Sequence, residues 1–118
     1  MGIKNYKDLI VWQKSMDLAV IIYNEVKLLP REEVYSLSDQ IRRAVISIPS
    51  NIAEGQQRNA PGDFRRFLSI AKGSLGELET QIILCEKLGY FKEDKTEFIL
   101  DKCTEIGKML NGLINSLQ

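Results

Sequence analysis

Apolar residues recur at intervals of three and four along four separate segments of this chain, which is the spacing of one face of an α-helix. In the first segment, residues 6–29, the row consists of Leu9, Trp12, Met16, Ala19, Tyr23 and Val26. Further helices are expected over 37–57, from Pro61 to near Gly89, and over 94–117. No segment of useful length alternates with the period of two that marks a β-strand. The pattern predicts an all-α fold, an antiparallel up-down four-helix bundle, with residues 1–118 as one domain.

A proline lies inside the second predicted helix without interrupting its apolar face. The apolar row keeps its phase on both sides of Pro49, through Leu37, Ile41, Ala44, Ile48 and Ile52. Two independent helices would have no reason to share that phase. We therefore expect one helix, kinked at Pro49, where the carbonyl of Val45 loses its amide partner.

The first helix has more apolar surface than a single contact requires. A second row lies beside the first one and contains Val11, Leu18, Ile22 and Leu29. A helix that is apolar on two faces usually has two neighbours, and one of them is often another subunit. Self-association is therefore expected; the alternative is a wide core that takes up both rows.

Two glycines, Gly73 and Gly76, lie inside the third predicted helix. A glycine in a helix interior costs about 1 kcal/mol relative to alanine, so each needs a reason. Close approach of the second helix to a thin patch on the third would supply that reason.

The zero net charge conceals a basic centre, because residues 42–72 carry six basic and two acidic side chains. Arg58, Arg65 and Arg66 surround the second turn, and Arg42 lies further back on the second helix. These four arginines are candidate phosphate contacts for RNA or DNA. The alternative interpretation is an ordinary solvated surface.

A hairpin of the second and third helices brings together residues whose numbers add to about 121, which groups several polar side chains. The predicted polar network consists of Arg43, Asn51, Glu54, Glu77 and Glu79, with Arg42 beside it. One interpretation is an interhelical ion-pair network between the arginines and Glu77 and Glu79 that fixes the register. The other interpretation makes the arginines phosphate contacts.

Catalytic and metal-binding chemistry has little support in this sequence. The chain has no histidine, and its two cysteines, Cys85 and Cys103, lack the spacing of a metal or redox motif. We expect these thiols to be buried, and we expect no enzyme activity, metal or cofactor. No apolar run reaches the roughly 18 residues that span a bilayer, and the N-terminal residues do not resemble a signal peptide. A cytoplasmic protein without a membrane segment is expected.

Three segments, YKDLIVWQKS (6–15), PREEVYSLSDQIRRAVISIPSNIAEG (30–55) and FRRFLSIAKGSLGELET (64–80), resemble the 23S rRNA intervening-sequence proteins of bacteria. This resemblance implies an antiparallel four-helix bundle that assembles into a ring-like homopentamer. The chain is also similar to the accessory protein of diversity-generating retroelements, which implies RNA or DNA and a reverse transcriptase as candidate partners. The alternative function is a protein scaffold that binds no nucleic acid.

Overall fold

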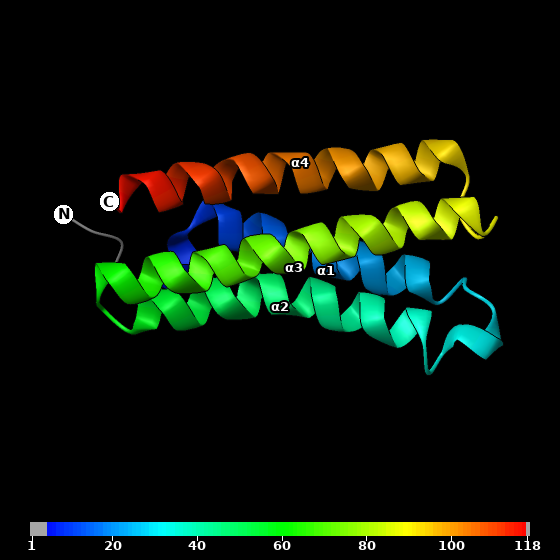
Figure 1. The fold of residues 1–118 in the computed structure, drawn as a ribbon, viewed down its shortest axis with the longest axis horizontal. Helices are drawn as coiled ribbons and strands as arrows, with labels where there is room; N and C mark the ends of the chain where they lie inside the picture. The colour runs from blue at the N-terminus through cyan, green and yellow to red at the C-terminus, as the bar shows by residue number, and fades with distance from the viewer. Residues whose placement is uncertain (1–4, 118) are drawn as a thin grey trace.

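The computed structural model describes residues 5–117, which form four α-helices and two short 3-10 helices (Figure 1). The α-helices are α1 (Ile10–Val26), α2 (Leu37–Gln57), α3 (Pro61–Lys87) and α4 (Glu93–Ser116), and the 3-10 helices are η1 (Tyr6–Asp8) and η2 (Arg31–Glu33). No β-strand occurs within the described range, so the predicted all-α, four-helix fold is confirmed. The first helix, predicted over 6–29, is shorter at both ends: it begins at Ile10 because Leu9, with φ −74° and ψ 125°, is extended, and it ends at Val26. Residues 1–4 and 118 of the predicted domain lie outside the described residues.

Successive helices run in opposite directions along the long axis of the molecule (Figure 1). Between α2 and α3, the Ser47 and Ser74 hydroxyl oxygens lie 2.7 Å apart, as the predicted register requires. Helices α1 and α4 are also antiparallel. Lys14, early in α1, pairs with Glu105, whereas Glu25, late in α1, pairs with Lys95, near the start of α4. The chain therefore follows an up-down-up-down path.

Both apolar rows of the first helix contribute to the core, as in the alternative of a wide core: Leu9 and Val26 of the first row are buried in it, and Trp12, Ala19 and Tyr23 pack against it. The supposed second row, Val11, Leu18, Ile22 and Leu29, is buried in the core that all four helices share. The first row lies mostly at the edge of the α1–α2 contact, where Met16 is 41% exposed. The reason is that α1 contacts both α2 and α4, so its core face points between these two neighbours. The second row therefore gives no evidence for self-association.

One continuous helix passes through Pro49, as predicted, and the proline is buried. Its residues face the core at Ile41, Ala44, Ile48 and Ile52 on both sides of the proline. The kink at Pro49 stays a prediction.

The close approach between α2 and α3 occurs at Gly55 rather than at the glycines of α3. A Cβ on Gly55 would lie 2.6 Å from the Cβ of Phe67 and 3.3 Å from Cδ1 of Phe64. Gly73 and Gly76 are exposed, and a Cβ on either would have no neighbour within 4 Å. The predicted thin patch on α3 is therefore wrong, because both α3 glycines lie on the side of that helix that faces away from the core.

At one end of the bundle, the turn before α2 is joined to the turn before α4. The Tyr90 hydroxyl donates a 2.6 Å hydrogen bond to Oε2 of Glu33 in η2. This bond is the main cause that lowers the pKa of Glu33, and it raises the pKa of Tyr90 to about 12. The bond thus requires an ionised carboxylate and a protonated phenol.

Replacing Tyr90 with phenylalanine is expected to lower the melting temperature in a pH-dependent way. The Glu33 pKa is lowered by folding, so its bond stabilises the protein above the ordinary value of 4.5 and stops doing so as the pH falls through the lowered value. The Tyr90 pKa is raised, so its contribution is complete below 10.0 and disappears as the pH rises through about 12. Thermal melts across the acid range should show parent and Tyr90→Phe proteins converging at low pH. A constant difference between them would contradict this account.

Candidate nucleic-acid and protein interfaces

Two of the predicted phosphate-binding arginines lie against the same aromatic ring. The guanidinium carbons of Arg58, just after α2, and Arg66, in α3, are 4.8 Å and 4.5 Å from the ring centroid of Phe67. Phe67 itself is buried where it packs on Gly55. A cation over an aromatic face is attracted by the ring's negative face, so each arginine has a favourable position on the bundle surface.

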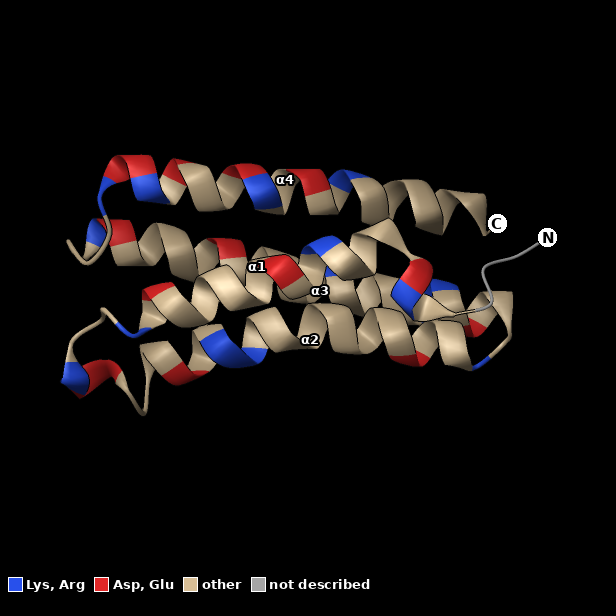
Figure 2. Cartoon of the chain, turned by 180° about the vertical axis from the view of Figure 1, so that it is seen from behind, with Lys and Arg blue, Asp and Glu red and all other residues tan. Residues whose placement is uncertain are grey.

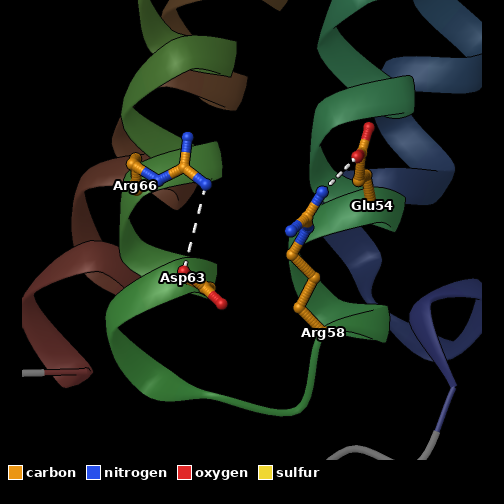
Figure 3. Close-up of polar contacts among 4 residues, drawn as sticks. All are labelled: Glu54, Arg58, Asp63 and Arg66. Carbon is orange, nitrogen blue, oxygen red and sulfur yellow. Dashed lines mark hydrogen bonds and ion pairs between the residues drawn. The ribbon is translucent and has the colours of Figure 1, made fainter.

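Both of these arginines also have a carboxylate partner within four residues (Figure 3). Nη2 of Arg58 lies 2.9 Å from Oε2 of Glu54, and Nη2 of Arg66 lies 3.9 Å from Oδ1 of Asp63. The pairs are exposed, so each is worth about 1 kcal/mol or less. They nevertheless reduce the local positive charge that would attract phosphate.

Arg65 has a different role, because it contacts the far end of the chain. Its side chain is half-buried, and Nη1 donates a 2.9 Å hydrogen bond to the carbonyl of Leu117. A cation at this position satisfies a carbonyl at the C-terminal end of α4 and interacts favourably with the helix dipole. Arg65 therefore joins the start of α3 to the end of α4.

The predicted ion-pair network between α2 and α3 does not form. Arg43 pairs with Asp39 of its own helix at 3.0 Å. Within residues 5–117 no ion pair joins Arg42 or Arg43 to Glu77 or Glu79. The reason is that neither glutamate faces α2.

Glu77 and Glu79 lie on other sides of α3. Glu77 is exposed on the outer side of α3. Glu79 is half-buried and close enough to Cys103 of α4 for its charge to help raise the pKa of that thiol. Ser74 is the α3 side chain that meets α2 at this level.

Asn51 takes part in a polar contact between α2 and α3. Its Nδ2 donates to the carbonyl oxygen of Ser47 at 2.8 Å and lies 2.9 Å from the Ser47 hydroxyl, which in turn contacts Ser74. Three half-buried polar side chains thus satisfy one another at the edge of the core.

A surface that the sequence did not predict lies between α1 and α2. It consists of two adjoining hollows, of about 370 and 560 Å³, that share Ile46 and Ser50. We call it the α1/α2 groove; its residues are Tyr6, Trp12, Met16, Ala19, Tyr23, Asp39, Arg42, Arg43, Ile46, Ser47, Pro49, Ser50, Asn51, Ala53 and Glu54. The sequence feature that could have indicated this groove is the first apolar row of α1, because a row with this spacing forms a surface that can pack against a helix.

The groove has an apolar end and a polar end. Trp12 and Met16 line the apolar end, and the ring of Trp12 is edge-on to Tyr6 with centroids 5.3 Å apart. At the polar end the Arg42 guanidinium lies 5.9 Å from the ring centroid of Tyr23 and has no ion-pair partner in the described part of the chain. The same end also holds Asp39, Arg43 and Glu54, so its two arginines are matched by two carboxylates. Of these four residues, only Arg42 makes no ion pair among the described residues.

The two thiols have the environment of core residues. Both are buried, and burial is the main cause that raises the pKa of Cys85 to about 11 and that of Cys103 to about 12. They stay protonated at neutral pH and are therefore poor nucleophiles. Among residues 5–117 no group of three or more potential metal ligands gathers, and no helix is long and apolar enough to cross a membrane.

The family model of the 23S rRNA-intervening sequence proteins matches residues 7–112. The chain belongs to this family. A similar crystal structure is that of a protein of unknown function from the S23 ribosomal protein family of Bacteroides thetaiotaomicron. It shares 34% identity with a TM-score of 0.83, and the match covers 90% of this intervening-sequence protein and 96% of the Bacteroides protein. No curated protein matches the chain.

Proposed function

We propose that this intervening-sequence protein is a non-enzymatic, self-assembling helical scaffold that holds a protein partner. The observation that carries the proposal is the set of large apolar side chains left exposed on α1, α2 and α3. The set includes Met16, Val20, Ile46, Ile70, Ile83 and Leu84, with Leu88 directly after α3. Met16 and Ile46 line the same groove, and large apolar side chains grouped on a surface are typical of sites that contact another protein. The resemblance to the family supports a pentameric ring as the assembled form.

The paired arginines favour a protein scaffold over a nucleic-acid binder. Arg58, Arg66 and Arg43 each have a carboxylate partner, whereas Arg65 contacts the neutral carbonyl of Leu117 and Arg42 makes no ion pair among the described residues. Phosphate binding depends on positive charge that can replace the counterions of the nucleic acid. Arginines whose charge is already balanced provide less of that attraction.

Light scattering on the purified protein tests the assembly. At micromolar concentration we expect a particle several times heavier than the 13.5 kDa chain. A species of 13.5 kDa across that range would contradict the proposal. Co-purification identifies the partner, and a reverse transcriptase is the first protein to test because the resemblance to retroelement accessory proteins implies it.

Nucleic-acid binding is the second candidate function, and Lys72 is the observation that favours it. Lys72 is exposed, lies in the basic centre and has no ion pair among the described residues. A mobility shift with structured RNA at about 50 mM salt tests this candidate, because phosphate contacts weaken steeply as the salt concentration rises. Salt-sensitive binding that Arg66→Glu and Lys72→Glu abolish together, while the oligomer stays intact, would favour this function. Absence of binding would favour the protein scaffold.

A further inference from the structure

The end of α4 has a sequence that favours a helix only weakly. Residues 111–117 read NGLINSL, with two asparagines, one glycine and one serine among them. Each of these residue types favours a helix less than alanine, leucine or lysine does. The Ser116 hydroxyl also donates a 2.7 Å hydrogen bond to the carbonyl oxygen of Leu113, and such bonds offer the backbone an alternative to the helical pattern. This segment therefore depends on contacts with the rest of the bundle to stay helical.

The packing of this segment against the bundle is sparse. The last buried residue of α4 in the described chain is Leu110, and the apolar side chains of residues 113, 114 and 117 are only partly buried. Leu113 lines two hollows, of about 360 and 470 Å³, which the segment shares with the start of α1 and the turn after α2. No charged residue lies between Lys108 and Leu117, so this end of α4 is tan in Figure 2. A segment with so few buried contacts can open without unfolding the whole protein.

Arg65 makes a polar contact that restrains this segment. From the start of α3, its half-buried side chain donates a 2.9 Å hydrogen bond from Nη1 to the carbonyl oxygen of Leu117. Because the donor is charged, this bond is stronger than one between neutral groups. The bond is lost when the segment leaves the bundle, so Arg65 is positioned to control how often residues 111–117 open.

The opened segment contains a pair of residues with chemistry of its own. Asn111 is followed by Gly112, and both are exposed. The backbone nitrogen of Gly112 can attack Cγ of Asn111, because glycine has no side chain to hinder the approach. A bond from this nitrogen to Cγ forms, the bond from Cγ to the side-chain nitrogen breaks, and ammonia leaves with the proton. Water then opens the cyclic imide to aspartate or isoaspartate.

The helix prevents this reaction as long as it is closed. In an α-helix the backbone N–H of Gly112 is bonded to the carbonyl four residues earlier, and the fixed backbone dihedrals hold its nitrogen away from the Asn111 side chain. The attack therefore requires residues around Gly112 to leave the helical conformation. The rate of the reaction then follows the fraction of time that the segment is open.

We propose that residues 111–117 open from the bundle as a local unit, that Arg65 restrains this opening, and that Asn111 is a site of spontaneous deamidation in the opened state. The product carries a negative charge near the C-terminal end of a helix, where the helix dipole makes it unfavourable. Isoaspartate also lengthens the backbone, which interrupts the helical hydrogen-bond pattern. The modification thus makes the opening permanent, and the site exists in a single chain whether or not copies assemble.

Hydrogen exchange measured by mass spectrometry tests the role of Arg65. Arg65→Gln weakens the bond to Leu117, so the amides of residues 113–117 should exchange about tenfold faster than in the parent. Arg66→Gln is the matched control, because Arg66 contacts Asp63 and the Phe67 ring rather than α4. These contacts persist in the opened state, so the control should leave exchange at 113–117 unchanged. Unchanged exchange in Arg65→Gln, or the same increase in both variants, would overturn the role of Arg65.

The parent protein tests local opening without any substitution. Local opening exposes little surface, so the exchange of residues 113–117 should respond only weakly to low urea concentrations, whereas that of residues 99–110 should rise steeply. The same steep response in both ranges would mean that this end of α4 opens only with the whole protein. Circular dichroism verifies that each variant folds, and this measurement decides on local opening even where a variant does not.

Deamidation is measured in the same proteins at mildly alkaline pH, by mass spectrometry of the peptide that contains Asn111. Arg65→Gln should convert Asn111 about tenfold faster than the parent, and Arg66→Gln should match the parent. The parent in concentrated urea gives the rate without a helix and should exceed every folded protein. An Asn111 that converts in urea but not in Arg65→Gln, or that converts at one rate in all samples, would overturn the modification site.

Discussion

Replacing Gly55 with leucine is expected to destroy the native packing of α2 on α3. Even an added Cβ would lie 2.6 Å from the Phe67 Cβ and 3.4 Å from the Phe64 Cα. Neither of these atoms moves when a side chain changes rotamer, so space can be made only by separating the two helices. The core between α2 and α3 would then lose its close packing along that end of the bundle.

The smaller substitution Gly55→Ala gives a lower limit for the loss of stability expected from leucine. Gly55→Ala gains about 1 kcal/mol of helix propensity but overpacks the contact, which typically costs about 1–3 kcal/mol and more where backbone must move. We therefore expect a net loss of stability for alanine and loss of cooperative unfolding for leucine. Urea denaturation followed by circular dichroism measures both.

Gly112→Ala provides the control for the propensity term. Gly112 lies inside α4, is exposed, and has nothing within 4 Å of its Cβ position. Alanine there should raise the free energy of unfolding by about 0.5–1 kcal/mol. A Gly55→Ala protein that gains as much as Gly112→Ala would show that α2 and α3 do not approach this closely.

The bounds of α2, α3 and α4 could be read from the sequence because the apolar periodicity agrees with the positions of proline and glycine, whereas α1 is shorter at both ends than the predicted 6–29. The apolar row and the residues around Pro61 and Gly89 place α2 and α3 correctly, and α4 differs from its predicted bounds by one residue at each end. The roles of the two α1 rows could not be read in the same way. Spacing shows which residues share a face, but the face that becomes core depends on where the neighbouring helices lie.

The glycines show how helical phase could have corrected a wrong expectation. Leu75, Leu78 and Ile82 define the core face of α3, and Gly73 lies off that arc, so its exposure was available from the sequence. Gly55 shares the phase of Ile48 and Ile52 and is buried with them. A glycine on a core face indicates close approach, whereas an outward glycine gives no such indication by itself.

Some partners of the arginines could be predicted from the sequence and others could not. Arg43 with Asp39 and Arg58 with Glu54 are pairs four residues apart, which a sequence can predict. The contact of Arg65 with Leu117 depends on how α3 and α4 pack, so no local pattern reveals it. The α1/α2 groove likewise exists only once two helices are placed side by side.

Replacing Phe67 with alanine is expected to lower the free energy of unfolding by about 3–5 kcal/mol. The ring is buried where α2 ends against α3, and Gly55, on which it packs, has no side chain that could fill part of the resulting cavity. The same change removes the ring on which Arg58 and Arg66 lie. Chemical denaturation of the parent and variant measures the loss.

Phe67→Leu separates packing from the attraction of the ring for the arginines. Leucine keeps much of the apolar volume, so it should cost far less than alanine, but it cannot interact with a cation as an aromatic face does. Arg66→Gln should therefore destabilise the parent more than it destabilises the Phe67→Leu protein, by about 0.5–1 kcal/mol. Loss of the pair with Asp63 occurs in both backgrounds and cancels in this comparison. Equal costs in the two backgrounds would mean that the attraction of the ring does not hold Arg66 in place.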